Sequence, residues 1–356
     1  MKKICFITIG NIYMVPYINT YANQIKNKYS IIYWDREGKN EDNEDVKYYR
    51  FYKELSPKDK LKKIIGFIQY RNFIKRILLE EKFDLVIFLQ TWSALLMADF
   101  VEKFYPGKYI VDVRDYTHEK NAIIYNREKK LMKKAAMCVI SSEGYKEFLP
   151  PHDYYIFHNA RELPVEKVAA LRERKKEKGT LNISFIGYVN YQEQHKKLLL
   201  GLKNDPRFHL NFIGTRAKEL EPFCKENGIN NVTLKDTFAS SKTLDFYENT
   251  DFVNNLYGNN TPTLDYALSN KLYFAAELRM PILTCPNTYM SKVSGEYEFG
   301  LNVDLDAPLI GDRLWNYYTS IDWSRLNSGC EKFMNKVNLE QKASREKLIE
   351  IISKEN

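Results

Sequence analysis

The sequence predicts an α/β protein of two domains, each with a parallel sheet and crossover helices. Its length of 356 residues exceeds one ordinary core and suits two domains of about 150 to 180 residues. Hydrophobic residues make up 44% of the chain and aromatic residues 14%, so there is ample material to bury. Short apolar runs also alternate with longer segments of helical period, a pattern typical of strands buried on both faces. A small single module and a disordered chain are excluded.

The expected strands fall into two series, which predict two sheets along the chain. The first series contains residues 3–9, 29–34, 85–89, 108–112, 137–141 and 154–157. The second begins at Leu181, His209, Asn231, Asp251 and Met280. A charged segment with Pro164 and Gly179 separates the series. We therefore expect domains at 1–165 and 181–327, a linker at 166–180 and terminal helices at 328–356.

Charge and cysteine content narrow the class of protein. Lys and Arg outnumber Asp and Glu by 54 to 46, a net charge of +8 that suits an anionic ligand or a membrane surface and does not require nucleic acid. The five cysteines are widely spaced, which favours reduced thiols over disulfides or zinc. The start, MKKICFITIG, predicts a strand rather than a signal peptide, and no apolar run is long enough to span a bilayer. We expect a cytoplasmic protein, or one peripheral at the inner face of the membrane.

Glycines follow three of the expected strands, at Gly10, Gly187 and Gly214. A glycine at the carboxyl end of a parallel strand lets the backbone approach a ligand, and the next helix N-terminus favours an anion. Tight turns without a ligand remain an alternative at each. No G-x-G-x-x-G or P-loop pattern occurs, which argues against a dinucleotide dehydrogenase or a P-loop enzyme.

The segment LYGNNTPTLDYALSNKLYFAAELRMPILTC contains Ser269, Asn270 and Lys271 at the start of an expected helix that leads to Pro281 and a strand. A second segment, FIGYVNYQEQHKKLLLGL, combines an expected strand, a glycine and a lysine-bearing helix. Both segments resemble the donor site of the retaining family 4 glycosyltransferases and their capsular polysaccharide relatives. The resemblance implies the GT-B fold, with two Rossmann-like domains facing across a cleft and helices at the C-terminus.

The resemblance also implies which residues hold a nucleotide-diphosphate sugar. Fixed cations must stabilise the leaving diphosphate, a role expected of Lys271 and of Lys196 or Lys197, whereas most lysines are simply solvated. Ser269 and Asn270 are expected to cap their helix. The full expected donor set is Gly187, Tyr188, Lys196, Lys197, Gly214, Arg216, Tyr257, Ser269, Asn270, Lys271 and Glu277.

The chain departs from the family at several of these positions. Phe274 and Tyr266 stand where many members carry two glutamates, and Arg279 and Tyr188 replace a glycine and an arginine. Glu277 lies one turn beyond Phe274 and is expected either to bind the ribose hydroxyls or to be an exposed helix glutamate. These departures leave the stereochemical outcome open.

An acceptor site is expected in the first half, at YIVDVRDYTHEKN. Asp112, Arg114, Asp115 and His118 cluster after a strand, where ligands bind in open α/β sheets. Asp115 and His118 are expected to orient the acceptor hydroxyl and, with Lys271, to be catalytic; a salt-bridged loop is the alternative. The expected acceptor set is Gly10, Asn11, Trp92, Arg114 and Asp115.

The predicted activity is transfer of a sugar, with a UDP-sugar preferred, to a glycan or polyprenyl-linked acceptor in bacterial surface polysaccharide synthesis. No metal or other cofactor is expected, because no D-x-D pair ends a donor-half strand; Asp304 and Asp306 are interpreted as a loop. A GT-B sugar-nucleotide epimerase and a non-catalytic nucleotide-sugar-binding homologue are the alternatives. The basic segment near 58–82 predicts a helix that either contacts a membrane or packs on its own sheet. No nucleic-acid-binding signature is present.

Overall fold

The structure, a computed structural model, describes residues 2–25, 29–42, 46–55, 59–173 and 179–354. They form two compact units, Met1–His158 with Leu339–Asn356, and Asn159–Asn338. The boundaries of these units differ from the domain boundaries expected from the sequence. The segment expected as a linker belongs to the second unit, and the last helix contributes residues to both.

The first unit contains a seven-stranded parallel sheet, in the order β3-β2-β1-β4-β5-β6-β7. Strands β1, β4 and β5 are buried along their whole length, which explains their unbroken apolar sequences. The strands are β1 (Ile4–Thr8), β2 (Tyr29–Asp35), β3 (Lys47–Tyr52), β4 (Leu85–Leu89), β5 (Tyr109–Val113), β6 (Met137–Ile140) and β7 (Tyr154–Ile156).

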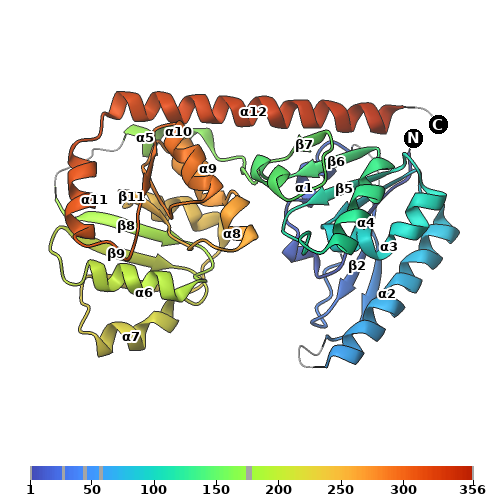
Figure 1. The fold of residues 1–356 in the computed structure, drawn as a ribbon, viewed down its shortest axis with the longest axis horizontal. Helices are drawn as coiled ribbons and strands as arrows, with labels where there is room; N and C mark the ends of the chain where they lie inside the picture. The colour runs from blue at the N-terminus through green and yellow to red at the C-terminus, as the bar shows by residue number, and fades with distance from the viewer. Residues whose placement is uncertain (1, 26–28, 43–45, 56–58, 174–178, 355–356) are drawn as a thin grey trace. The chain divides into compact units, whose positions relative to one another are not determined.

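Helices cover this sheet (Figure 1). Buried Tyr21 and Phe157 pack with Leu348 of the last helix in one core, and the Ser344 hydroxyl donates to the Ile156 carbonyl oxygen at 2.7 Å. The end of the chain is thereby fixed to this unit. The helical segments are η1 (Ile12–Met14), α1 (Ile18–Ala22), α2 (Lys60–Glu81), α3 (Thr91–Phe104), α4 (Ala122–Lys133), η2 (Glu143–Glu147) and α12 (Trp323–Ser353).

Helix α2 packs through a different stripe in each half. Its second half buries Tyr70, Ile74 and Ile77 against the sheet. In its first half only Gly66 is buried, against Trp34, where a Cβ atom would lie 2.9 Å from the indole ring. Phe67 is half-buried against Trp34, and Leu61, Ile64, Ile65 and Ile68 of that half are exposed. Packing on the sheet therefore accounts for only part of the apolar sequence of this helix.

The second unit contains a six-stranded parallel sheet, in the order β10-β9-β8-β11-β12-β13. Successive strand residues point to opposite faces, so Phe185 belongs to one core and Ile186 to another. The strands are β8 (Leu181–Ile186), β9 (Phe208–Ile213), β10 (Val232–Lys235), β11 (Phe252–Asn255), β12 (Ile282–Thr284) and β13 (Gly300–Asn302). The prediction of two parallel sheets is confirmed.

Figure 1 shows helix α6 on one face of this sheet and α9 and α10 on the other. The helical segments are α5 (Val165–Glu173), α6 (Gln192–Gly201), η3 (Ala217–Leu220), α7 (Glu221–Glu226), η4 (Ser240–Tyr247), α8 (Pro262–Tyr266), α9 (Asn270–Glu277), α10 (Tyr289–Glu296) and α11 (Ile310–Thr319), followed by the first part of α12. None of the helices in the described part of the chain is both long and apolar enough to cross a membrane.

A pair of carboxyl groups is buried beneath the loop that follows β5. Glu119 and Glu128 are 4% and 0% exposed, and Glu119 accepts a hydrogen bond from the backbone N–H of Thr117 at 2.7 Å. Burial, together with the charge of Glu119, raises the pKa of Glu128 to about 9. Glu128 is therefore protonated at neutral pH in the folded protein.

Glu128→Gln is expected to stabilise the protein above pH 5. The folded state holds a proton on Glu128 up to about pH 9, whereas the unfolded chain releases it near pH 4.5, so wild-type stability falls as pH rises between these values. A neutral amide removes that loss, and we expect a gain of about 1 to 3 kcal/mol at pH 8 and none at pH 4. Urea unfolding at both pH values measures this, with exposed Glu80→Gln as control. An equal effect at pH 4 and pH 8 would contradict the assignment.

Gly214→Ala is expected to destabilise the second unit. Gly214 follows β9 with φ 134°, and a Cβ atom there would lie 1.9 Å from the Gly187 carbonyl oxygen. Because backbone must move, we expect a loss of about 2 to 4 kcal/mol in thermal unfolding. Gly228→Ala is the matched control. Gly228 has a φ of 59°, but a Cβ atom there would meet nothing within 4 Å, so we expect a loss of only about 1 to 2 kcal/mol in stability, from the backbone conformation alone. Equal losses would show that the close approach to Gly187 costs nothing.

Candidate functional site

Lys271 is a buried cation at the carboxyl edge of the second sheet. It is the second residue of α9 and only 7% exposed. Its Nζ donates to the Tyr257 hydroxyl at 2.6 Å and lies 4.0 Å from the centre of the Phe185 ring. Among the described residues, no carboxylate lies within ion-pair distance of Nζ. A buried ammonium without a counter-charge is costly unless an anion binds it.

Gly187 leaves the space beside this ammonium open. It follows β8 with φ 131°, and a Cβ atom on it would lie 3.6 Å from the Lys271 Nζ. The missing side chain gives a ligand access to the backbone at this point. The structure thus brings together Gly187, Gly214, Tyr257 and Lys271, four of the residues expected to bind the donor.

The start of α9 differs in detail from the expectation. Ser269 occupies the N-cap position, but its side chain makes no capping hydrogen bond. Its hydroxyl donates instead to the Asn255 Oδ1 at 2.7 Å. The expected side-chain cap at Ser269 is therefore wrong: the hydroxyl is oriented toward the end of β11 and accepts no hydrogen bond from the first turn of α9. Asn270 is the first residue of the helix, and its expected ligand contact stays a prediction.

A cavity of about 280 Å³ opens between the ends of β8, β11 and β12 and the helices that follow them. Tyr188, Tyr257 and Ser269 of the expected donor set line it. Sequence reasoning missed its other lining residues, of which Asn255 carried a signal: it is the second of two amides that end an otherwise apolar strand. These others are Asn190, Tyr191, Asn255, Gly258, Thr263, Leu264, Ala267, Cys285, Thr288 and Met290.

His195 lies next to this charge and is itself neutral. Its ring is fully buried on α6, 4.6 Å from the centre of the Phe185 ring. Burial lowers the pKa of His195 to about 4, and the charge of Lys271 contributes to that shift. At neutral pH this imidazole therefore carries no positive charge that would compete with Lys271 for a bound anion.

Four other residues of the expected donor set pair with carboxylates or guanidinium groups outside this cavity. Lys196 contacts Glu193 at 2.8 Å, and Lys197 contacts Asp306 at 2.6 Å. The two remaining pairs are Arg216 with Glu219, at 2.9 Å, and Glu277 with Arg172, at 2.8 Å. A donor contact by these four stays a prediction. They do not line the cavity, and neither do Gly187, Gly214, Asn270 and Lys271; Lys271 is joined to its wall by the hydrogen bond to Tyr257.

Phe274 fills its position with an aromatic contact. Its ring is buried and stacks on Tyr247, with centroids 5.1 Å apart and planes 19° apart. Phe274 is thus part of the core that supports α9. The site relies on Lys271 and on neutral polar groups.

In the first unit, Arg114 is enclosed by a network of its own. Its guanidinium binds Asp112 at 2.7 and 2.8 Å, donates to the Phe157 carbonyl oxygen at 3.0 Å and lies 4.2 Å from the centre of the Tyr17 ring. Tyr21 donates to the same Asp112. This pair fixes the end of β5, so the salt-bridged loop weighed above is present at Arg114.

Asp115 and His118 lie on the loop that begins at this pair. The Asp115 side chain is exposed. Partial loss of solvation around its carboxyl group nevertheless raises its pKa, and the charge of Arg114 has a smaller, lowering effect. His118, with φ 71°, lines a second cavity together with Trp92. The structure therefore separates Asp115 and His118, which face solvent, from buried Arg114.

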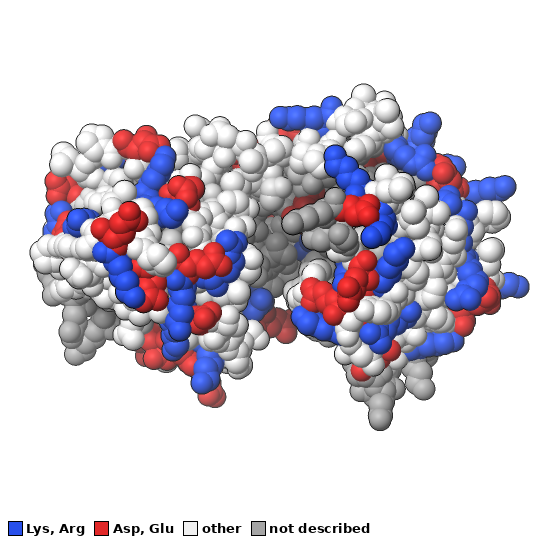
Figure 2. Space-filling view, turned by 90° about the horizontal axis from the view of Figure 1, so that it is seen from below, with Lys and Arg blue, Asp and Glu red and all other residues white. Residues whose placement is uncertain are grey.

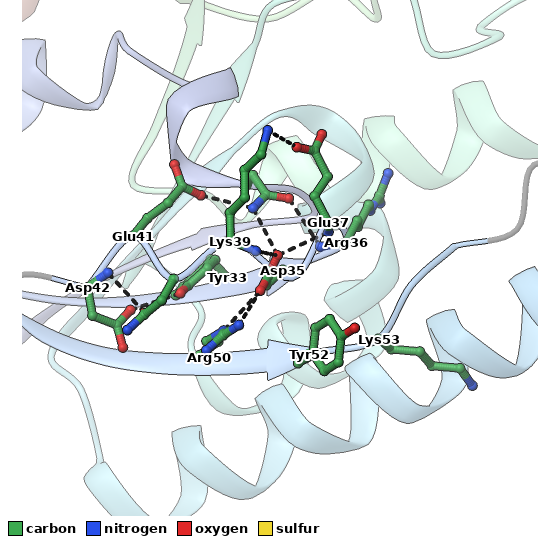
Figure 3. Close-up of polar contacts among 12 residues, drawn as sticks. Tyr33, Asp35, Arg36, Glu37, Lys39, Glu41, Asp42, Arg50, Tyr52 and Lys53 are labelled. Carbon is green, nitrogen blue, oxygen red and sulfur yellow. Dashed lines mark hydrogen bonds and ion pairs between the residues drawn. The ribbon is translucent and has the colours of Figure 1, made fainter.

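Gly10 and Asn11 follow β1, and Asn11 holds the loop after β2. Asn11 is fully buried and donates to Asp35 and to Glu41, each at 3.0 Å, while its side-chain oxygen accepts from the Arg36 backbone N–H. Figure 3 shows the network around Asp35, which Arg50 also binds. Asn11 thus anchors a loop in the structure, and its acceptor contact, like that of Gly10, stays a prediction.

Comparison with known proteins identifies the fold. No family model matches the chain, and no curated protein matches it. The sucrose-phosphate synthase of Thermosynechococcus elongatus matches with a TM-score of 0.70 at 11% identity, over 98% of this chain and 97% of the other. Anabaena HepE, solved with UDP and glucose, matches with a TM-score of 0.64 at 11% identity over 100% of both chains.

Two further solved structures bear on the alternatives. WaaG, a glycosyltransferase involved in lipopolysaccharide biosynthesis, matches with a TM-score of 0.61 at 12% identity, over 99% of this chain and 100% of the other. A putative UDP-N-acetylglucosamine 2-epimerase from Listeria monocytogenes matches with a TM-score of 0.54 at 9% identity, over 92% and 90%. With two parallel sheets in series and matches along its whole length, this chain has the GT-B fold of these glycosyltransferases.

Proposed function

We propose that this protein is a glycosyltransferase that uses a nucleotide-diphosphate sugar. The observation that carries the proposal is the buried Lys271 ammonium, which lies beside Gly187 at the edge of a GT-B sheet. Such an ammonium stabilises an anion that forms as a bond breaks, because it is fixed and shielded from water. HepE, of the same fold, binds UDP and UDP-glucose, which supports a UDP-sugar as the donor.

The proposed reaction breaks the bond between the anomeric carbon and the diphosphate oxygen and forms one to the acceptor oxygen. Lys271 stabilises the departing diphosphate, and the aromatic side chains Tyr188, Tyr191 and Tyr257 line the donor cavity. The acceptor proton passes to the departing phosphate oxygen, which makes a strong base unnecessary. We propose retention of configuration on this basis, and no metal ion, since Lys271 supplies the charge.

We assign the reaction to synthesis of a bacterial surface polysaccharide, with a glycan or lipid-linked acceptor held by the first unit. The role of WaaG in lipopolysaccharide biosynthesis supports this assignment. The protein would work in the cytoplasm, at the inner face of the membrane. We propose no nucleic-acid partner; Figure 2 shows Lys and Arg interspersed with Asp and Glu on the face drawn, unlike the continuous basic stripe of a nucleic-acid site.

Two other functions are each favoured by one observation. The epimerase match favours chemistry on the nucleotide sugar alone, and Phe274 in place of a carboxylate favours binding without catalysis. A radiolabelled donor assay separates the three: transfer yields a glycosylated acceptor, epimerisation yields an altered nucleotide sugar without acceptor, and a binding protein yields neither. The assay is run in EDTA and repeated with manganese; a strict requirement for manganese would contradict metal-free transfer.

Lys271→Met is expected to lower turnover about 100- to 1000-fold, the loss of about 2.7 to 4 kcal/mol typical for one fixed group aimed at a charged transition state. Methionine keeps the packing against Phe185 and Tyr257, so thermal unfolding should change little. UDP affinity, measured by calorimetry, should fall as well. Lys225→Met, an exposed lysine on α7, is the control. Turnover like wild type in the purified Lys271→Met variant would remove the lysine from the mechanism.

Asp115→Asn is expected to reduce transfer while UDP affinity stays unchanged, because Asp115 belongs to the unit proposed to hold the acceptor. Its surroundings raise the carboxyl pKa, so the carboxylate form, and with it kcat/KM, is lost as pH falls through that pKa. The asparagine variant should lose this acidic limb of the pH profile. An unchanged limb, or a fall in UDP affinity as large as the fall in transfer, would show that Asp115 acts elsewhere.

A further inference from the structure

A second cavity, of about 600 Å³, lies within the first unit at the carboxyl edge of its sheet. It opens where β1 and β2 end and is bounded by α2, α3, the loop after β5 and α4. Apolar side chains make up most of its wall, and three cations and a histidine complete it. The lining residues are Ile9, Arg36, Lys63, Phe67, Trp92, Leu95, Leu96, His118, Ile123, Ile124 and Arg127.

The charge of this cavity is positive and incompletely neutralised. No Asp or Glu is among its described lining residues. Arg127 pairs with exposed Asp99, but neither Arg36 nor Lys63 has a carboxylate within ion-pair distance in the part of the chain described. The cavity therefore favours an anion over a neutral sugar.

Arg36 is placed to meet that anion. Its guanidinium lies 4.8 Å from the centre of the Trp34 ring and 5.9 Å from that of Phe67. Its Nε and Nη2 atoms are buried without a hydrogen-bond partner among the described residues. Figure 3 shows the side chain pointing away from the Asp35 network, whose carboxylate is held by Asn11 and Arg50. Burial lowers the pKa of Arg36, and a buried charged group is normally paired with a ligand or a counter-ion.

Other polar atoms at the same sheet edge also lack partners. The Thr8 Oγ1 at the end of β1, and the Gln90 Oε1 and Thr91 Oγ1 after β4, are buried and make no hydrogen bond within the described chain. Strands β2, β1 and β4 are adjacent, so these atoms and Arg36 share one edge. Buried polar atoms are nearly always paired. These three atoms belong to residues that do not line the cavity but lie on the sheet edge that borders it.

The surface next to the cavity is apolar and basic. Helix α2, which contributes Lys63 and Phe67 to the cavity, leaves Leu61 and Ile64 67% and 57% exposed. Ile65 and Ile68 are exposed on the same half-helix, and Ile123 on the cavity wall is 78% exposed. Such residues beside lysines are typical of a helix that lies in the interface of an anionic bilayer.

We propose that this cavity binds the phosphate or diphosphate headgroup of a lipid-linked acceptor, with Arg36 and Lys63 on the anion and Phe67 and Trp92 on the first carbons of its apolar chain. The proposal rests on the proposed function. It narrows the acceptor to one that is linked to a lipid through a phosphate or diphosphate, in place of a free glycan. The exposed apolar residues of α2 then lie where the lipid leaves the membrane.

Farnesyl diphosphate, a soluble lipid diphosphate, tests this with the full chain by calorimetry. We expect saturable binding, with Kd raised at least about tenfold in Arg36→Met and in Lys63→Met, since each removes a charged hydrogen-bond donor. Lys62→Met is the matched control, because Lys62 is adjacent on α2 and exposed but does not line the cavity. Lys63 is exposed, so its variant should fold, and thermal unfolding checks all three variants. Inorganic pyrophosphate and farnesol should each bind more weakly than farnesyl diphosphate.

Three results would overturn the proposal: no saturable binding of farnesyl diphosphate, an equal loss in Lys62→Met and Lys63→Met, or pyrophosphate binding as tight as that of farnesyl diphosphate, which would indicate a site for soluble phosphates. UDP binding is measured on the same samples. Failure of the proposed function appears as wild-type protein that binds no UDP, whereas failure of this inference leaves UDP binding intact.

Discussion

The burial of one ammonium group, that of Lys271, is the constraint around which the second unit is arranged. A charge removed from water is tolerated only where other groups replace the lost solvation. Here the Tyr257 hydroxyl and the face of the Phe185 ring supply part of that solvation, and His195 stays neutral beside it. In the proposed function an anion supplies the rest, and Gly187 has no side chain in the space beside the ammonium. The site is therefore organised before its ligand arrives, which is what transition-state stabilisation requires.

In the first unit, buried charges are likewise stabilised by other groups, but here most of these groups are charges of the protein itself. Its Asp112–Arg114 pair and its Asp35–Arg50 pair each combine a buried carboxylate with a cation, so their charges are internally neutralised and hold the ends of β5 and β2 in place. Arg36 follows Asp35 directly but points away from it. Within one loop, the first charged residue is thus part of a buried ion pair, whereas the second lines a cavity.

The sequence predicted the sheets well because strands such as β1 and β4 are buried on both faces and so are apolar throughout. It missed β3 and β13. Strand β3 is at the edge of its sheet and half-exposed, so its residues KYYRFY mix charge with aromatics. Strand β13 is also at an edge, and its residues GLN are partly exposed and not an apolar run. Helix α2 shows a further limit of prediction from the apolar pattern. Its apolar residues Leu61, Ile64, Ile65 and Ile68 are exposed, and Gly66 rather than a large residue faces Trp34.

The sequence by itself determined the two-domain α/β architecture, and the helix that begins at Asn270 identified Lys271 as a candidate from its local motif. Which charges are available to a ligand was decided only by the tertiary structure. Lys197 is paired by Asp306 and Glu277 by Arg172, and each partner lies more than a hundred residues away in the chain. No sequence pattern indicated Arg36. Its Nε and Nη2 atoms lack a hydrogen-bond partner among the described residues, and this depends on how β2, α2 and α3 pack. Burial and pairing are properties of contacts between distant segments, and these emerge only when the chain folds.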